Sequence, residues 1–217
     1  MTLRRRLLAL YGGSALQRIY TRFKCSILPF EQFSGALPQS GTIVDIGCGY
    51  GYVANYLSLA APARRVIGVD PSATRIEAAR RAAGSRPNIE FLRGDVTALP
   101  PVIDAALIAD VLHHIPYDGQ RGVLRALFER LRPGGVLVIR ETAKQPSLRY
   151  WLFHCLLEGL LYAGEEKWRF RTAGEWRTML EAIGYAVERV TPSAWYSWYV
   201  TATLLCRKPG PVPAGRG

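Results

Sequence analysis

The feature that most constrains this 217-residue chain is a short apolar run that ends in alternating glycines, Val44–Gly51. Glycine stands at Gly47, Gly49 and Gly51, where it lets the backbone turn sharply and approach a ligand without a Cβ in the way. The following sequence, Gly51–Leu59, predicts a helix whose first N–H groups face the loop. The run therefore predicts a strand, a ligand-binding loop and a helix in succession.

The residues around this loop alternate between strand and helix patterns. Further strands are expected at Val66–Asp70, Ile89–Arg93, Asp104–Asp110 and Val136–Arg140, and helices at Ser72–Ala83 and Gly119–Leu131. A helix at Thr172–Ile183 and two strands near Tyr185–Val190 and Ser197–Cys206 complete the pattern. This order is typical of an α/β fold with a Rossmann-like, doubly wound, seven-stranded sheet that ends in an antiparallel hairpin.

The length and the position of these elements favour a single domain over residues 1–208. Residues 1–35 predict a basic amphipathic arm with an N-terminal helix, and residues 146–171 predict an apolar helical insertion. The proline- and glycine-rich residues 209–217 predict a disordered tail. Four widely spread cysteines favour a reducing compartment and hence a cytoplasmic protein.

An acid at the end of the second strand, Asp70, indicates what the glycine loop binds. It follows Gly51 by 19 residues, the position from which an acid accepts hydrogen bonds from ribose hydroxyls. The glycine spacing is G-x-G-x-G, and Tyr52 stands where the dinucleotide fingerprint has its third glycine. Asp45, just before the loop, suits a cationic amine better than a pyrophosphate. The pattern predicts an adenosine-like ligand that is not a dinucleotide.

At this point residues 40–142 resemble the class I S-adenosylmethionine-dependent methyltransferases, and most of all the small-molecule enzymes with a Leu-His-His motif after strand four. The resemblance implies S-adenosylmethionine as cofactor. Five segments carry it in order: Asp45–Gly51, Gly68–Ser72, Gly94–Val96, Asp110–Ile115 and Leu131–Gly135. The cofactor-binding residues that it implies are Asp45, Gly47, Cys48, Gly49, Gly51, Asp70, Pro71, Asp95, Val96, Asp110 and Leu112.

Each of these acids also has a purely structural interpretation. Asp45 and Asp70 could cap helices, whereas Asp95 and Asp110 could shape turns at strand ends. Cys48 is expected to be a small packed side chain rather than a nucleophile.

Three residues are candidates for catalysis. His113 and His114 follow the fourth strand, and either is a candidate general base; the alternative is that both pack or cap the loop. Glu141 ends the fifth strand and could orient the acceptor or pair with Arg140. The chain has only one further histidine, His154, so a histidine-rich metal site is not expected.

The acceptor is suggested by apolar and basic segments outside the motifs. The insertion is strongly apolar, while residues 1–40 carry six of the basic residues and one acid in a chain of net charge +11. Together they favour an apolar or lipid-like acceptor, methylated at oxygen, and contact with an anionic membrane surface on its inner face. The alternative is an insertion that simply covers the cofactor.

Other functions remain open at this stage. The charge also fits an RNA methyltransferase, although neither an Asn-Pro-Pro-Tyr-type motif nor a Pro-Cys pair is present, which disfavours nucleic acid. A non-catalytic cofactor-binding scaffold subunit and a cyclopropane-forming enzyme are further alternatives. The sequence leaves the oligomeric state open.

Overall fold

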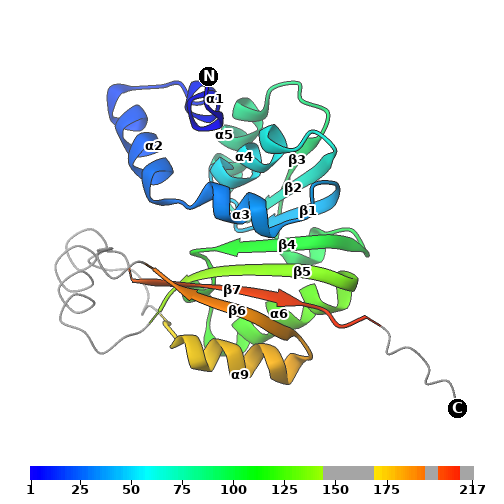
Figure 1. Ribbon diagram of the computed structural model, residues 1–217. Coiled ribbons are helices and arrows are strands. Elements are labelled where there is room, and N and C mark those ends of the chain that lie inside the picture. The colour runs from blue at the N-terminus through cyan, green and yellow to red at the C-terminus, as the bar shows by residue number, and fades with distance from the viewer. Residues whose placement is uncertain (144–168, 194–199, 211–217) are drawn as a thin grey trace, which may run out of the picture. The chain divides into compact units, whose positions relative to one another are not determined.

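The computed structural model describes residues 1–143, 169–193 and 200–210 of the chain. In this part, hydrogen bonds order the strands β3-β2-β1-β4-β5-β7-β6 (Figure 1). The strands are β1 (Gly41–Ile46), β2 (Arg64–Asp70), β3 (Ile89–Arg93), β4 (Ile103–Ala109), β5 (Leu131–Thr142), β6 (Ala186–Pro192) and β7 (Thr201–Arg207). β2 runs parallel to both β1 and β3, whereas β7 runs antiparallel to both β5 and β6. The predicted α/β class, Rossmann-like seven-stranded sheet and C-terminal antiparallel hairpin are confirmed.

Helices alternate with these strands much as the hydrophobic pattern predicts. They are α1 (Leu3–Ala9), α2 (Ala15–Ile27), α3 (Phe30–Ala36), α4 (Tyr52–Ala60), α5 (Ala73–Ala83), α6 (Tyr117–Arg130) and α9 (Ala173–Ile183), with short 3₁₀ turns η1 (Val96–Ala98) and η2 (Leu112–His114). Helix starts follow the expected capping chemistry. Ser14 and Gln17 form a capping box at α2, and Thr172 and Glu175 form one at α9.

The chain divides into two compact units, which are described separately. Unit 1 comprises Met1–Leu107 with Arg130–Arg132, and unit 2 comprises Ile108–Glu129 with Pro133–Gly217. The single domain expected over residues 1–208 stays a prediction.

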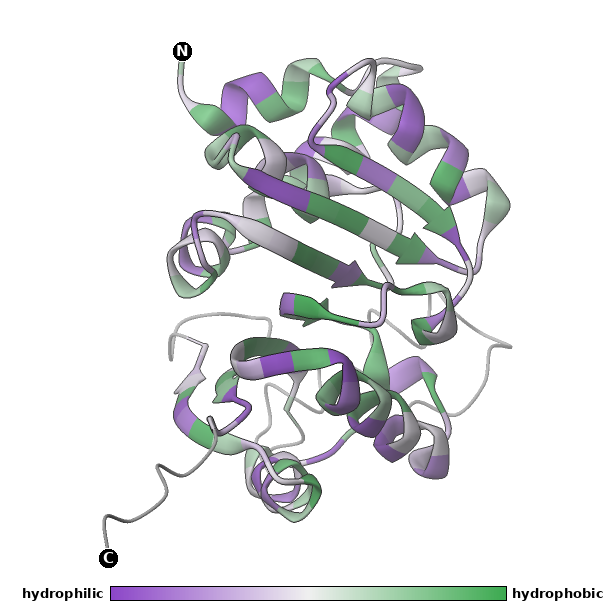
Figure 2. Cartoon of the chain, turned by 90° about the vertical axis from the view of Figure 1, so that its right-hand side faces the viewer, coloured by the Kyte–Doolittle hydropathy of each residue, from purple (hydrophilic) through white to green (hydrophobic). Residues whose placement is uncertain are grey.

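Unit 1 has its core around the parallel strands, along which Figure 2 shows green bands of hydrophobic residues. Ile43 and Val44 of β1 face register partners Val66 and Ile67 of β2, and all four are fully buried. Strands buried on both faces read as continuous apolar runs, which is why these segments stand out in the sequence. The core fixes the carboxyl ends of β1 and β2, from which the glycine loop and Asp70 project.

Helix α3, which the sequence pattern does not predict, is held by a buried arginine. The Arg64 guanidinium donates to the carbonyl oxygens of Pro38 and Ser34 at 2.7 and 2.8 Å. Burial lowers the pKa of Arg64, so these hydrogen bonds offset the cost of placing a charge inside the unit. Arg64 also extends β2 two residues beyond the predicted start at Val66.

Unit 2 packs its antiparallel strands with α6 and α9. Trp176 and Leu180 of α9 are buried, and the Tyr185 hydroxyl donates to the Leu124 carbonyl of α6 at 3.0 Å. Most of the predicted insertion (146–171), and all but the first two residues of the predicted tail (209–217), lie outside the described residues, as does His154. In the described part, no helix has both the length and the apolar character needed to cross a membrane.

Candidate cofactor and acceptor site

The glycine loop between β1 and α4 uses its glycines in two different ways. Gly47, Gly49 and Gly51 all adopt left-handed φ angles of 65°, 55° and 76°. A Cβ on Gly51 would lie 2.8 Å from side-chain atoms of Ala79 and Phe91, so Gly51 is needed for packing. A Cβ on Gly49 would meet nothing within 4 Å. The loop therefore has open space beside Gly49, where a ligand can approach the backbone closely.

Asp70 joins the end of β2 to the glycine loop. Its carboxylate is buried, and Oδ2 accepts a hydrogen bond from the Gly49 amide at 3.0 Å. Oδ1 accepts one from the Ser72 amide at 2.9 Å, at the start of α5. Each carboxylate oxygen has a second lone pair, so this position remains able to accept hydrogen bonds from ribose hydroxyls. The structure thus brings Asp70 and the loop together, as the sequence predicts.

Asp45 lies inside unit 1 under the first turn of α4. Its Oδ2 accepts a hydrogen bond from the Ala54 amide at 3.1 Å, which is the capping contact that the sequence leaves as an alternative. Burial, with a smaller contribution from the nearby charge of Asp70, raises the pKa of Asp45 to about 7, although the Ala54 amide opposes the shift. A cationic ligand group would favour the ionised form. The residue is therefore a structural cap whose charge depends on what binds.

The remaining predicted cofactor residues of unit 1 divide by exposure. Burial raises the pKa of the Cys48 thiol far above its usual range, so it is no nucleophile at neutral pH. Val96 is buried, whereas Pro71 and Asp95 are exposed. Asp95 Oδ1 accepts hydrogen bonds from the Thr97 amide and hydroxyl at 2.8 and 2.6 Å, the turn-shaping alternative. Its contact with an adenine stays a prediction.

Unit 2 contributes a second set of buried polar groups after β4. Asp110 is the only non-glycine residue with positive φ (56°) in the described chain, a conformation that Asp tolerates better than most residues. Its Oδ2 forms an ion pair with Arg140. Its Oδ1 is buried and has no hydrogen-bond partner among the described residues. A buried acceptor without a donor is costly, so Asp110 is suited to receive a ligand donor.

Glu141 is paired with a histidine and not with its neighbour Arg140. Its Oε2 lies 2.7 Å from His113 Nδ1, and both side chains are almost fully buried. Its Oε1 accepts the backbone N–H groups of Val111 and Leu112 at 2.8 and 2.6 Å. Because a carboxylate only accepts, Nδ1 carries a proton, and in the neutral imidazole Nε2 then has the lone pair. This is the arrangement of a carboxylate that orients a general base.

His114 differs from His113 in its surroundings. The two imidazole rings lie 4.2 Å apart between centroids, but His114 is exposed and His113 is buried beside Leu112. Gln120 holds this turn, since its Nε2 donates to the carbonyl oxygens of Leu112 and Ile115 at 3.0 and 3.2 Å. Nothing in the sequence singles out Gln120, because it is one polar residue on an amphipathic helix.

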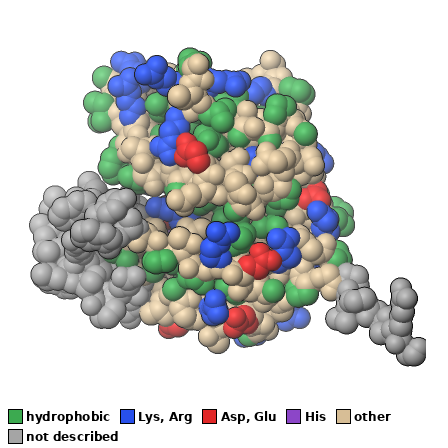
Figure 3. All heavy atoms as spheres, viewed as in Figure 1, with side chains coloured by type: hydrophobic (Ala, Val, Ile, Leu, Met, Phe, Trp, Pro, Cys, Tyr) green, Lys and Arg blue, Asp and Glu red, His purple; other side chains and the backbone are tan. Residues whose placement is uncertain are grey.

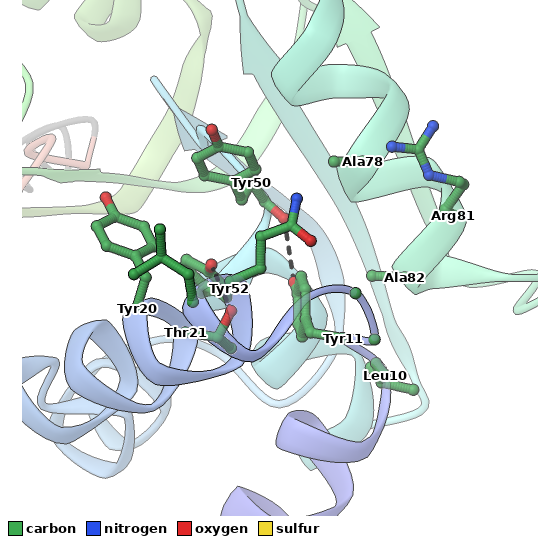
Figure 4. Close-up of a pocket in the computed structure, with 13 residues that line it drawn as sticks. Leu10, Tyr11, Tyr20, Thr21, Tyr50, Tyr52, Ala78, Arg81 and Ala82 are labelled. Atoms are coloured by element: carbon green, nitrogen blue, oxygen red, sulfur yellow. Dashed lines mark hydrogen bonds between the residues drawn. The ribbon is translucent and has the colours of Figure 1, made fainter.

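Unit 1 also contains a cavity of about 750 Å³ beside the glycine loop. Figure 4 shows α5, with Ala78 and Arg81, across the cavity from α2, with Tyr20 and Thr21. Its lining residues are Leu10, Tyr11, Gly12, Gly13, Leu16, Gln17, Tyr20, Thr21, Tyr50, Tyr52, Ala78, Arg81 and Ala82. None of the predicted cofactor residues lines this cavity.

A hydrogen-bonded tyrosine, Tyr11, stabilises one wall of the cavity. The sequence does not reveal these contacts. The Tyr11 hydroxyl donates to the Tyr50 carbonyl at 3.1 Å and accepts from Asn55 Nδ2 at 3.0 Å. The Tyr52 hydroxyl lies 3.0 Å from the Thr21 hydroxyl of α2. These bonds attach the arm to the glycine loop. The only sequence signal is that two tyrosines, Tyr50 and Tyr52, flank Gly51.

Among the described residues, no group of three or more His, Cys, Asp or Glu side chains is arranged to hold a metal ion. The polar groups at the glycine loop are carboxylates and backbone amides directed at a loop with open space. They fit the nucleoside of S-adenosylmethionine, as the resemblance implies.

Comparisons with known proteins agree with this geometry. Residues 43–135 match a family model described as a methyltransferase domain. The chain is 31% identical over 164 residues to trans-aconitate 2-methyltransferase of Azoarcus sp. (strain BH72), covering 74% of this chain and 55% of the relative. It is 36% identical over 108 residues to tRNA U34 carboxymethyltransferase of Shewanella sp. (strain ANA-3), covering 46% of this chain and 31% of that protein.

A solved structure of the mitomycin 7-O-methyltransferase MmcR is 26% identical, with a TM-score of 0.65 over 82% of this chain and 52% of that one. The chain spans about half the length of the trans-aconitate 2-methyltransferases that it matches.

Proposed function

We propose that the chain, which carries a class I S-adenosylmethionine-dependent methyltransferase domain, transfers the cofactor's methyl group to an oxygen atom of an apolar small molecule. The observation that carries the proposal is the glycine loop, which has open space beside Gly49 and is hydrogen-bonded through Gly49 to the buried Asp70. The expected cofactor, S-adenosylmethionine, is the cofactor of this family.

Several residues of this chain would hold the cofactor. In unit 1, the loop amides around Gly49 and the carboxylate of Asp70 would bind the ribose side, while Asp45 supplies negative charge for a cationic group. The cofactor supplies an electrophilic methyl group on a sulfonium. The protein's own contribution is to position the reactants and to keep water away.

The proposed base is His113, with Glu141 as its positioning residue. A hydroxyl becomes a better nucleophile when a base removes its proton in the transition state. Glu141 holds His113 in the tautomer whose Nε2 accepts a proton, and Glu141 is itself held by two backbone amides. His114, which is exposed, is the second candidate. A base of this kind supports oxygen as the acceptor atom.

A cavity beside the glycine loop, which neither His113 nor the predicted cofactor residues line, supports an apolar ligand for unit 1. Leu10, Leu16, Ala78 and the rings of Tyr20 and Tyr50 make most of its wall apolar. Pockets of about 300–1,000 Å³ with such walls are the usual size for small-molecule ligands. The similarity to a mitomycin 7-O-methyltransferase adds support for an oxygen acceptor on a small molecule. A cytoplasmic protein at the inner face of the membrane fits such an acceptor.

A labelled-methyl assay tests the proposal. The protein and methyl-labelled S-adenosylmethionine are mixed with host extract that has been separated into lipid, small-molecule and RNA fractions. We expect label in an organic-soluble product, none with Asp70→Ala, and unchanged label with Val102→Ser, an exposed substitution far from the loop in sequence. Label confined to RNA would contradict the proposal.

RNA methylation is the second candidate because a specific observation favours it. The net charge is +11, and a tRNA U34 carboxymethyltransferase is among the relatives. The same assay distinguishes the two, since an RNA product resists organic extraction and is destroyed by ribonuclease. Cofactor binding without any labelled product would instead favour a scaffold subunit.

A further inference from the structure

Helix α2 is amphipathic, but its apolar stripe faces solvent. Leu16, Ile19 and Phe23 are 76%, 64% and 57% exposed. They lie three and four residues apart, so they form one stripe, which we call the outer stripe; Leu16, at one end of it, also lines the cavity beside the glycine loop. The face that unit 1 buries is the opposite one, with Thr21 and Cys25. A helix that only covered the domain core would be turned the other way.

This concentration of exposed apolar side chains is peculiar to the arm. In the described part of the chain, the exposed large hydrophobic residues outside α2 are Met1, Tyr50, Val102 and Tyr117, spread over separate elements. Single exposed apolar residues are ordinary, but a contiguous row on one helix marks an interaction surface.

Arginines gather on the side of α2 that faces α1. Arg5 of α1 and Arg18 and Arg22 of α2 line a cleft of about 290 Å³ between the two helices, which we call the arginine cleft. Arg22 lies at the edge of the stripe, whereas Arg18, one turn before it, lies beside Thr21 on the side of α2 that faces α1. In Figure 3, blue basic and green apolar side chains gather at the upper left, where Figure 1 shows α1 and α2.

Few acidic residues lie close in sequence to the arginines of this cleft. The only acid in the first 44 residues is Glu31. Arg4 engages it with two hydrogen bonds, of 2.9 and 2.8 Å, and lowers the pKa of Glu31 to about 2. Glu31 is therefore already paired. The arginine cleft has the charge and the size to receive a phosphate group.

We propose that the α1–α2 arm docks on an anionic lipid bilayer. The outer stripe enters the boundary between headgroups and acyl chains, and the arginine cleft binds lipid phosphates beside it. A helix with an apolar stripe flanked by arginines is the pattern of interfacial membrane helices. A nucleic acid would use the arginines but leave Leu16, Ile19 and Phe23 in water. This proposal does not depend on the methyl acceptor.

The test is flotation of the full chain with vesicles of phosphatidylcholine alone and of phosphatidylcholine with phosphatidylglycerol. We expect binding to the anionic vesicles that weakens as salt is added. Ile19→Gln with Phe23→Gln, and separately Arg18→Gln with Arg22→Gln, should each lower the partition coefficient by about tenfold or more.

Matched control variants separate the surface from general changes in charge or polarity. Ile19→Leu with Phe23→Leu keeps the stripe apolar and should retain binding. Val102→Gln removes an exposed apolar residue elsewhere, and Arg121→Gln with Arg125→Gln removes two exposed cations of α6; both should bind as the parent does. Thermal melting of every variant shows that the fold is kept.

Three results would overturn the proposal. The first is equal binding by the stripe variant and the parent, and the second is equal binding to both vesicle types. The third is binding of tRNA instead of vesicles, weakened by the arginine substitutions and unaffected by those of the stripe.

Discussion

At the scale of single residues, two glycines of the same loop, Gly49 and Gly51, have different surroundings. Gly49 and Gly51 share a left-handed backbone, but only Gly51 has side chains of Ala79 and Phe91 against its Cα. The conformation alone therefore does not tell whether a glycine serves packing or ligand access. The space around it does.

Alanine substitutions separate the two roles. Either change forces an L-residue into a left-handed conformation, at about 1 kcal/mol of folding free energy. Gly51→Ala adds a steric clash and should cost roughly 1–3 kcal/mol more. Gly49→Ala should retain most stability but weaken S-adenosylmethionine binding. Urea unfolding and calorimetric titration measure both quantities, and equal stability losses would contradict this assignment.

The ionisation of a single residue, Asp45, makes the stability of the protein depend on pH. Its pKa is 3.8 in an ordinary environment and about 7 in the folded protein. Between these values the native state binds more protons than the unfolded state, so the free energy of unfolding falls as pH rises from about 4 to 7. A difference of this size corresponds to roughly 4 kcal/mol for one group.

Asp45→Asn isolates this contribution, because asparagine can still accept the Ala54 hydrogen bond but does not titrate. We expect the ligand-free parent to lose more stability than the variant between pH 5 and pH 8, as measured by urea unfolding. Parallel pH profiles for the two proteins would exclude the ionisation of Asp45 as the cause.

At the scale of elements, the end of β5 supports the turn η2. Glu141 accepts two backbone amides from the start of η2 and also engages His113. One carboxylate thereby fixes both the course of the turn and the tautomer of the histidine. Gln120 of α6 also holds this turn, because its Nε2 donates to the carbonyl oxygens of Leu112 and Ile115.

Glu141→Gln tests whether this residue of β5 contributes to catalysis through His113. Its carbonyl oxygen can still accept from the backbone, but its amide donates to Nδ1 and so places the proton on Nε2. We expect kcat to fall about 100-fold or more, with the acceptor KM and the cofactor Kd nearly unchanged. Arg121→Gln on α6 serves as control. A loss confined to KM or to thermal stability would mean that Glu141 only supports the turn.

At the scale of the whole molecule, the charge is distributed unevenly. The net charge is +11, and residues 1–40 account for +5 of it, because they contain six basic residues and one acid. An arginine-rich protein adsorbs nucleic acid through phosphates without reading its sequence. The charge alone therefore does not distinguish an RNA substrate from an anionic surface.

Salt dependence makes this distinction. We expect tRNA to bind at low ionic strength and to be released steeply as salt approaches about 0.2 M, without accepting methyl label. Filter binding over a salt series, together with the labelled-methyl assay on the same tRNA, measures both. Salt-resistant binding accompanied by label in tRNA would show that RNA is the substrate.

The class of fold, the glycine loop and the acid at the end of β2 can all be predicted from the amino-acid sequence. These depend on local chemistry: apolar runs form buried strands, glycine allows left-handed turns, and Asp70 comes directly after its strand. The resemblance to class I S-adenosylmethionine-dependent methyltransferases rests on the same residues and is confirmed by the matched domain.

The partners of these residues, and the faces that they bury, depend on how the elements pack together. Glu141 pairs with His113, 28 residues away, while Arg140 pairs with Asp110, and no periodicity distinguishes the two pairings. The orientation of α2 also depends on packing. An amphipathic helix has two faces, and the contacts with the rest of unit 1 determine which of them is buried. Contacts between distant residues depend on how the elements pack, and that information is absent from any single segment.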